Sequence, residues 1–271
     1  MLTRQSVCCQ LCDNLTEINV DLQVIVDNEE DLTHLKTIGR IVFETLTLMS
    51  KQMEIGMTTL ELDLIGAENL AKYGANSAPK VTYDFPGFTC ISINEEAAHG
   101  IPGNRIINAG DVVNIDVSAE LNGYFGDTGG TFLVPPVDPK MAYLCQSTRK
   151  ALREAMKVAK AGARINAIGR AIEKTAEKAG FVTLKDLGSH GIGRSLHDEP
   201  QFIPNFYDET DHRKLKEGQV ITIEPFLSTK AEATQTEDDG WTLTTGLGNF
   251  SAQYEYTMLI TKNKPMILTT I

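Results

Sequence analysis

Apolar residues recur at three- and four-residue steps from Glu30 onward, the period of an amphipathic helix. The repeating positions are Leu32, Leu35, Ile38, Val42, Thr45, Leu46 and Met49. A second helix is predicted to begin at Thr58, because Glu61 completes a capping box three residues later, and to stop at Gly74. Residues 75–135 instead carry strand and turn signals.

The same order of elements then recurs. A third helix is predicted to open with Asp138 as its N-cap and Pro139 in its first turn, and to end near Gly162. A fourth helix is predicted from about Ile165 to Gly180, and the remaining chain again carries strand and turn signals. Two helices followed by strands therefore occur twice.

Short sequence matches support an internal duplication. Glycines that precede and end the shorter helices form two pairs with the same offset, Gly56 with Gly162 and Gly74 with Gly180. Residues 110–116 resemble residues 218–224, and a His-Gly-Ile triplet begins at both His99 and His190. Together these matches predict two α+β units that share one core, with a pseudo-twofold cleft between their sheets.

Composition limits the class of protein. The chain has 271 residues, 42% of them apolar, which is ordinary for a globular protein of one large domain or two. Its 36 acidic and 25 basic residues give a net charge of −11, unfavourable for generic binding to nucleic acid or anionic membranes. The sequence has no transmembrane run and no secretory signal, so we expect a cytoplasmic protein.

Residues 1–28 differ from the rest because they show no helical period. They carry Cys8, Cys9 and Cys12, whose single C-x-x-C pair lacks the four ligands of a tetrahedral zinc site. Five cysteines in a long chain also argue against a disulfide framework. We therefore expect residues 1–28 to form a flexible N-terminal extension, and one hypothesis gives it a role in docking to the ribosome or a partner.

Acidic residues mark the candidate chemistry. Asp116 interrupts an apolar strand, where a carboxylate is costly to bury unless it is paired, protonated or bound to a metal. The Asn122-Gly123 turn predicts a hairpin that places Ser118 opposite Asp127 and puts both aspartates on one face. Asp127 alone would be better interpreted as a cap or turn residue, but the shared face favours a metal site.

The second unit repeats this pattern. Glu224 corresponds to Asp116 in the duplication, and Glu255 interrupts the strand that follows. Each half thus supplies two carboxylates, and four of them in one cleft would require positive charge, most naturally two divalent cations.

Histidines modify the expected ligand set. His99, His190 and His197 lie beside glycines and prolines, whereas His34 and His212 fit exposed positions. Imidazole is a ligand that suits zinc, cobalt, manganese or iron better than magnesium or calcium. The sequence does not select among these four metals.

Taken together, six segments resemble the type I methionine aminopeptidases of metallopeptidase family M24. The resemblance spans about residues 30–270 and rests on residues 90–102, 110–117, 126–128, 190–200, 223–225 and 251–255. It implies the α+β pita-bread fold of creatinases and aminopeptidases, with duplicated helix–helix–strand units around a central antiparallel sheet. The catalytic domain would then comprise residues 29–271.

The resemblance also implies the roles of individual residues. Two metal ions would be held by Asp116, Asp127, His190, Glu224 and Glu255. Asp127 and Glu255 would bridge the ions, Asp116 would complete one, and His190 with Glu224 the other. The residues implied to act in catalysis are His99, His197 and Glu224. The residues implied to bind substrate are His99 and His197, with Phe85, Cys90, Leu196 and Trp241 lining an apolar pocket.

The implied activity is removal of the initiator methionine from nascent polypeptides when the second residue is small. A hydroxide bridging two cobalt, manganese, iron or zinc ions would attack the peptide carbonyl. His197 would help to stabilise the oxyanion, His99 would hydrogen-bond the scissile amide, and Glu224 would carry a proton. The expected partners are nascent N-termini and, transiently, the ribosome, with no nucleic acid or membrane, and the expected state is a monomer.

Three positions depart from the family pattern. Leu196 stands where an aromatic residue is usual, Thr82 where tyrosine is common, and Ser189 where glycine is typical. None is an implied metal ligand, so the departures concern the shape of the pocket. Three other interpretations are a prolidase or aminopeptidase P, an inactive homologue that binds RNA or protein, and an unrelated metal-binding α+β domain.

Overall fold

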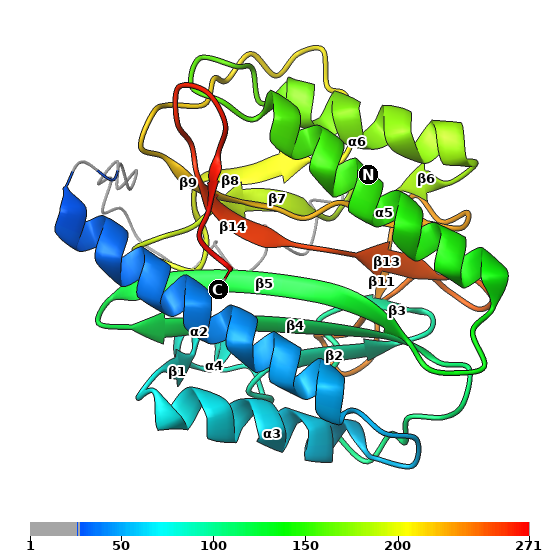
Figure 1. Cartoon of the computed structure of the whole chain (residues 1–271). Helices are drawn as coiled ribbons and strands as arrows, with labels where there is room; N and C mark the ends of the chain where they lie inside the picture. Colours follow the sequence, from blue (N-terminus) through cyan, green and yellow to red (C-terminus); the bar gives the residue numbers. More distant parts are fainter. Residues whose placement is uncertain (1–25, 27, 271) are drawn as a thin grey trace.

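The structure is a computed structural model that describes residue 26 and residues 28–270 (Figure 1). The predicted N-terminal extension and its three cysteines lie almost entirely outside these residues, so their interpretation stays a prediction. The helices are α2 (Glu29–Gln52), α3 (Thr59–Lys72), α4 (Ala78–Tyr83), α5 (Pro139–Val158) and α6 (Asn166–Ala179).

Fifteen short and long strands complete the described residues. In the first half they are β1 (Asn76–Ser77), β2 (Cys90–Ile93), β3 (Glu96–Ala98), β4 (Val112–Leu121) and β5 (Tyr124–Leu133). In the second half they are β6 (Val182–Thr183), β7 (Gly188–Gly191), β8 (Asp198–Pro204), β9 (Val220–Ile223), β10 (Phe226–Ser228), β11 (Gln235–Thr236), β12 (Leu243–Thr244), β13 (Ser251–Gln253), β14 (Tyr256–Leu259) and β15 (Met266–Ile267).

The four predicted helices are confirmed, and their caps explain where they begin. Thr58 and Glu61 form the predicted capping box of α3, and the Asp138 side chain accepts two backbone N–H bonds at the start of α5. The predicted end of α5 was wrong, since the helix stops at Val158 and Gly162 lies in the turn beyond it. Helix α4 was not predicted, because six residues with Pro79 in the first turn give no helical period.

The predicted hairpin is also confirmed. Strands β4 and β5 pair antiparallel along their whole length, and Ser118 lies opposite Asp127. Asn122 and Gly123 form the turn with φ of 56° and 78°, the left-handed conformations that such a tight hairpin requires. Strands β1 and β2 pair with β4 on its other side, which makes the sheet of the first half.

The second half is divided among three sheets. The largest has the order β15-β14-β9-β7-β8, a smaller one has the order β13-β10-β6, and the third joins β11 and β12 to β3 of the first half. Strand β9 ends at Ile223 and β10 begins at Phe226, so one chain segment passes from the first of these sheets to the second.

The two halves meet where β5 runs beside β13 and β14. Gly130 and Tyr254 form an antiparallel bridge, and the Glu255 N–H donates to the Gly129 carbonyl at 3.0 Å. The Thr257 hydroxyl accepts the Asp127 N–H at 3.0 Å and donates to the Asp127 carbonyl at 2.7 Å. This contact joins the two halves at Asp127 and Thr257.

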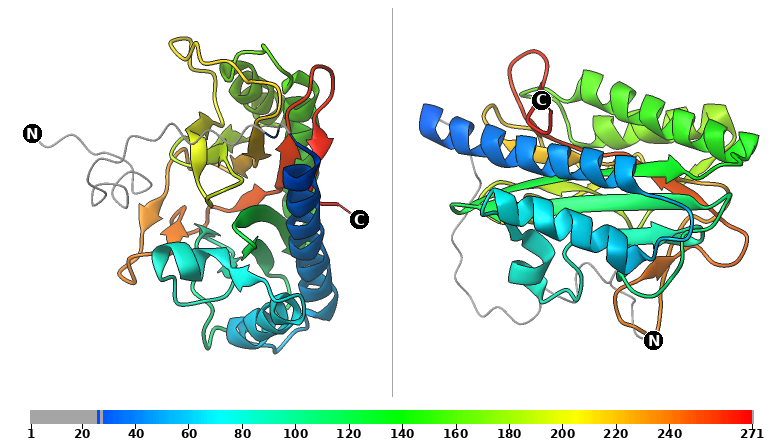
Figure 2. Two further views of the ribbon diagram at one scale, coloured as in Figure 1. Left: turned by 90° about the vertical axis from the view of Figure 1, so that its left-hand side faces the viewer. Right: turned by 60° about the horizontal axis from the view of Figure 1, so that its bottom comes forward.

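The long helices lie on one side of the strands. Figure 2 shows α2 and α5 on that side and the orange segment around β11 on the other. Each half has its own apolar core, but Leu259 and Leu268 from the second half belong to the core beneath α2. At Gly39 in α2, a Cβ atom would lie 2.4 Å from the Leu268 carbonyl oxygen. Among the described residues, no helix is long and apolar enough to span a membrane.

Candidate metal centre

Five predicted residues are brought together from both halves of the fold. Asp116 lies in β4 and Asp127 in β5, while His190 lies in β7. Glu224 directly follows β9, and Glu255 lies in the gap between β13 and β14. The site therefore forms where the two pseudo-equivalent sheets approach each other.

The ligand atoms lie close enough to share an ion. One atom each from Asp127, His190 and Glu255 lies within 4.8 Å of the other two. His190 Nε2 is 3.5 Å from Glu224 Oε1 and 4.0 Å from Asp127 Oδ2. The Asp116 and Asp127 carboxyl groups are within hydrogen-bonding reach of each other.

Neighbouring groups orient these side chains. His190 Nδ1 lies 2.8 Å from the Gly191 carbonyl, which can only accept, so Nδ1 carries the proton and Nε2 faces the carboxylates as an acceptor. Gln253 Nε2 donates to Glu255 Oε2 at 3.1 Å. The Ser189 hydroxyl accepts the Glu224 backbone N–H at 2.9 Å, so this departure from the family pattern has a structural partner.

The electrostatics of the cluster favour a bound cation. Burial, reinforced by neighbouring carboxylates, raises the pKa of Asp127, Glu224 and Glu255 well above the usual range. Burial also raises the pKa of Asp116 to about 6 and lowers that of His190 to about 4. The carboxyl shifts reflect negative charge held out of water, which a divalent ion would offset, and the lowered pKa of His190 leaves its imidazole neutral, the form that binds metal.

Two carboxylate oxygens indicate that the cluster is suited to binding a metal ion. Asp127 Oδ1 and Glu255 Oε1 are buried and accept no hydrogen bond from the described residues. Buried carboxylate oxygens are normally satisfied, so these two are suited to metal coordination. A donor set of carboxylates and one imidazole is also appropriate for a divalent transition metal.

Two further histidines lie next to the cluster. The His197 ring centroid lies 4.2 Å from that of His190, and burial lowers the pKa of His197 well below its usual value. The His99 side chain is exposed, yet the surrounding protein excludes enough water to lower its pKa too. Both imidazoles are therefore neutral at pH 7.

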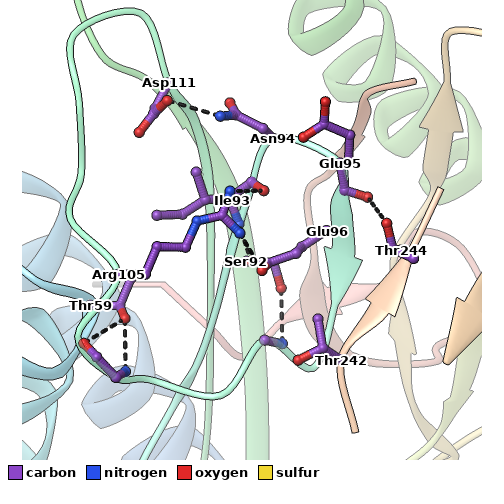
Figure 3. Close-up of polar contacts among 12 residues, drawn as sticks. Thr59, Ser92, Ile93, Asn94, Glu95, Glu96, Arg105, Asp111, Thr242 and Thr244 are labelled. Atoms are coloured by element: carbon purple, nitrogen blue, oxygen red, sulfur yellow. Dashed lines mark hydrogen bonds and ion pairs between the residues drawn. The ribbon is translucent and has the colours of Figure 1, made fainter. Parts of the chain in front are cut away.

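The segment that carries His99 is held in an unusual backbone conformation. His99 has a φ of 55°, and the following N–H of Gly100 donates to the Ser92 hydroxyl at 3.1 Å. Figure 3 shows this bond and a second set of contacts in which Arg105 reaches both Glu96 and the Ile93 carbonyl. The polar network thus fixes both ends of the loop that presents His99 to the cleft.

Comparison with known proteins identifies the family of this chain. Residues 33–262 match metallopeptidase family M24. The chain belongs to this family. It is 48% identical over 249 residues to methionine aminopeptidase 2 of Bacillus subtilis, covering 92% of this chain and all of that protein.

Solved structures of M24 proteins show the same fold. Methionine aminopeptidase from Thermotoga maritima superposes with a TM-score of 0.87 at 32% identity, covering 92% of this chain and 100% of that one. The prolidase from Pyrococcus furiosus gives 0.73 at 23% identity, over 93% of this chain and 66% of that one. The pita-bread fold predicted from the sequence is therefore confirmed.

Some of the residues predicted to line the substrate pocket of this M24 protein lie close to one another. Phe85 and Trp241 meet edge to face, with ring centroids 5.2 Å apart and an interplanar angle of 82°. Cys90 in β2 lies directly opposite Asp116 in β4. Leu196 is only 4% exposed and packs in the core beneath α2.

Two residues near this M24 site were not predicted from the sequence. The Tyr83 hydroxyl lies 2.5 Å from His197 Nδ1, while the neighbouring Thr82 side chain is exposed. Asp63 in α3 accepts the backbone N–H groups of Phe88 and Thr89, next to Cys90. Asp63 could have been noticed as a buried-face acid in an amphipathic helix, but no sequence signal placed Tyr83 beside His197.

Proposed function

We propose that this protein is a metal-dependent methionyl aminopeptidase that removes an N-terminal methionine followed by a small residue. The observation that carries the proposal is the buried cluster of four carboxylates and one imidazole, drawn from both halves of the fold. The likeness to named methionine aminopeptidases across 92% of the chain supports the same activity.

The proposed ligands are the five cluster residues, with Asp127 and Glu255 shared by two divalent ions. Asp116 would complete the set around one ion, and His190 with Glu224 the set around the other. Cobalt, manganese, iron and zinc all suit this donor set. When bound, such ions supply Lewis acidity that polarises a peptide carbonyl and lowers the pKa of water.

The remaining polar residues have proposed roles toward the peptide. His197, neutral and next to His190, would donate a hydrogen bond to the oxygen of the scissile carbonyl. His99 would hydrogen-bond the scissile amide nitrogen. Glu224, as a carboxylate beside the reacting atoms, would accept a proton and pass it to the leaving amine.

The apolar contact of Phe85 with Trp241 supports a pocket for the methionine side chain, with Cys90 at its wall and Leu196 behind His197. The thioether of methionine makes favourable contacts with aromatic rings, which supports this occupant. We further propose that nascent polypeptides are the substrates, that the enzyme acts as a cytoplasmic monomer, and that ribosome contact is transient.

The decisive experiment compares two peptides in the presence and absence of a chelator. Metal-loaded protein is incubated with Met-Ala-Ser and with Ala-Pro-Ser, and the released amino acid is measured. We expect chelator-sensitive release of methionine alone. Release only from Ala-Pro-Ser would instead indicate a prolyl-specific aminopeptidase, and no release with any of the four metals would contradict the enzymatic function.

A pair of variants links the activity to the cluster. Glu224→Gln keeps the size of the side chain but removes its charge, and we expect turnover to fall by about 10³-fold. Glu217→Gln makes the same chemical change on an exposed side chain seven residues earlier, and it should leave turnover unchanged. Equal activity in the two variants would contradict the proposed role of Glu224.

A further inference from the structure

Tyr83 is the last residue of α4 and makes a short contact with His197. Its hydroxyl lies 2.5 Å from His197 Nδ1, and the two rings are 5.6 Å apart with an angle of 45° between their planes. The contact joins elements 114 positions apart in the sequence. Tyr83 itself is neither a proposed metal ligand nor a proposed peptide-binding residue.

The chemistry of the two groups indicates which of them donates. A phenol O–H is a strong donor and a neutral imidazole nitrogen is a strong acceptor, and such pairs are short. An imidazole N–H donating to a phenol oxygen would normally give a distance of about 2.9 Å. With Nδ1 of His197 accepting, the ring proton must reside on Nε2, the remaining nitrogen and the one available to a substrate.

The backbone around Tyr83 is fixed on both sides. The next residue, Asp84, adopts a left-handed conformation with a φ of 59°, and its N–H donates to the Lys80 carbonyl at 3.1 Å. Lys80 Nζ in turn donates to the Pro86 carbonyl at 2.8 Å. Before the helix, the Ser77 hydroxyl donates to the Phe88 carbonyl at 2.7 Å.

The loop that carries His197 is held independently of Tyr83. The Arg194 guanidinium stacks 3.7 Å above the Tyr124 ring and donates to Asp31 at 2.9 Å. The Phe125 N–H donates to the Gly193 carbonyl at 2.8 Å. Loss of the Tyr83 hydroxyl should therefore change the imidazole without displacing the loop.

We propose that Tyr83 is a positioning residue that fixes the tautomer and orientation of His197, so that Nε2–H points into the cleft as a donor. The proposal rests on the proposed function, because the hydrogen bond from His197 would be made to the carbonyl oxygen of the peptide. Helix α4 would then affect catalysis only by orienting His197, because Tyr83 itself need not touch the substrate.

The test uses Tyr83→Phe in the metal-loaded enzyme with Met-Ala-Ser. We expect kcat to fall about tenfold while KM stays within twofold and the melting temperature is unchanged, because the lost donor matters most as charge develops on the oxygen. In a His197→Ala background the same substitution should have no further effect. Wild-type kcat in Tyr83→Phe, or a full additional loss in the His197→Ala background, overturns the proposal.

A spectroscopic readout separates this inference from the aminopeptidase activity. In zinc-loaded, ¹⁵N-histidine-labelled protein, His197 should show a protonated Nε2 and an unprotonated Nδ1, and Tyr83→Phe should shift it toward a mixture of tautomers. An unchanged pattern overturns the proposal even if the enzyme proves to act on another peptide. Tyr73→Phe is the matched control, because it removes a phenol hydrogen bond to Glu44 on the outer surface.

Discussion

The two acidic residues of the first half and the two of the second half lie on backbone segments of different conformation. In the first half, Asp116 and Asp127 lie on continuous, fully paired strands of one hairpin. In the second half, Glu224 follows the end of β9 and Glu255 lies in the gap between β13 and β14, so both acids occupy breaks in their strands. The first half uses the shorter carboxylate and the second half the longer one.

This difference shows how a duplicated pattern can yield one asymmetric site. A side chain on a continuous strand is aimed by the pleat, so an aspartate reaches the cleft directly. At a strand break the direction is set by local contacts, and for Glu224 and Glu255 these come from Ser189 and Gln253. Only the second half adds an imidazole, from His190.

The largest expected effect comes from removing the charge of Asp127, which lies on the seam between the halves. Asp127→Asn keeps the volume but leaves the proposed shared ligand neutral, and kcat/KM for Met-Ala-Ser should fall by about 10³-fold or more. Asp238→Asn, an exposed counterpart, should retain full activity. A fall of less than tenfold in Asp127→Asn would show that Asp127 is not shared between two ions.

The next effect concerns side-chain length. Asp116→Glu and Glu224→Asp each keep the charge but displace the carboxylate by about one bond, and each should lower kcat by about 10²-fold, since displacements near 1 Å have that cost. Because the two backbones differ, combining both substitutions should not restore activity. Recovery in the double variant, measured by single-turnover release of methionine, would mean that the halves are interchangeable.

A smaller effect is expected at the contact that joins the halves. Thr257→Val removes the hydroxyl that both accepts from and donates to the Asp127 backbone, and the free energy of unfolding should fall by about 2 kcal/mol. Thr257→Ser keeps the hydroxyl and should lose less than half as much. Equal losses in the two variants, determined by urea unfolding, would assign the effect to the methyl group instead.

The smallest effect is a pH dependence of the chelated protein. The pKa values of Asp127, Glu224 and Glu255 are raised by burial, so above the unfolded value of about 4 the folded state binds more protons and stability falls as pH rises. The buried histidines act oppositely below about pH 6.5, where the unfolded state binds more protons. Between pH 6.5 and 8 the histidines no longer contribute, and stability should fall as pH rises while the folded carboxyl groups still hold protons.

This dependence should disappear when metal is bound, because the carboxylates are then charged at every pH in the window. Urea unfolding at pH 6.5, 7.25 and 8, with and without chelator, measures it. A rise in stability with pH for the chelated protein would contradict the described burial of the acidic cluster.

Much of this arrangement could be predicted from residues that carry strong local signals. The Asn122-Gly123 turn fixed the register that sets Asp127 opposite Ser118, because only left-handed conformations fit a two-residue hairpin loop. The repeated segments around Asp116 and Glu224 predicted that both halves contribute to one cleft. Burial of a carboxylate in an apolar strand is costly enough to be informative without a structure.

Other features of the fold and the site depend on contacts between residues far apart in the sequence, which local patterns do not predict. Tyr83 reaches His197 through a six-residue helix that has no periodicity to detect. Tertiary contacts also end α5 at Val158. The Ala161 and Gly162 N–H groups donate to the carbonyls of Thr261 and Leu215 instead of continuing the helix. Local propensity could not predict either outcome, since both are decided by segments far along the chain.

The packing of Leu268 against Gly39 has a consequence for folding during synthesis. Helix α2 is among the first elements made, yet its core is completed by Leu259 and Leu268, which are among the last. Until those residues leave the ribosome, the apolar face of α2 has no complete partner, so the first half cannot reach its final stability alone. The catalytic cleft of this protein is therefore assembled only after nearly the whole chain has been translated.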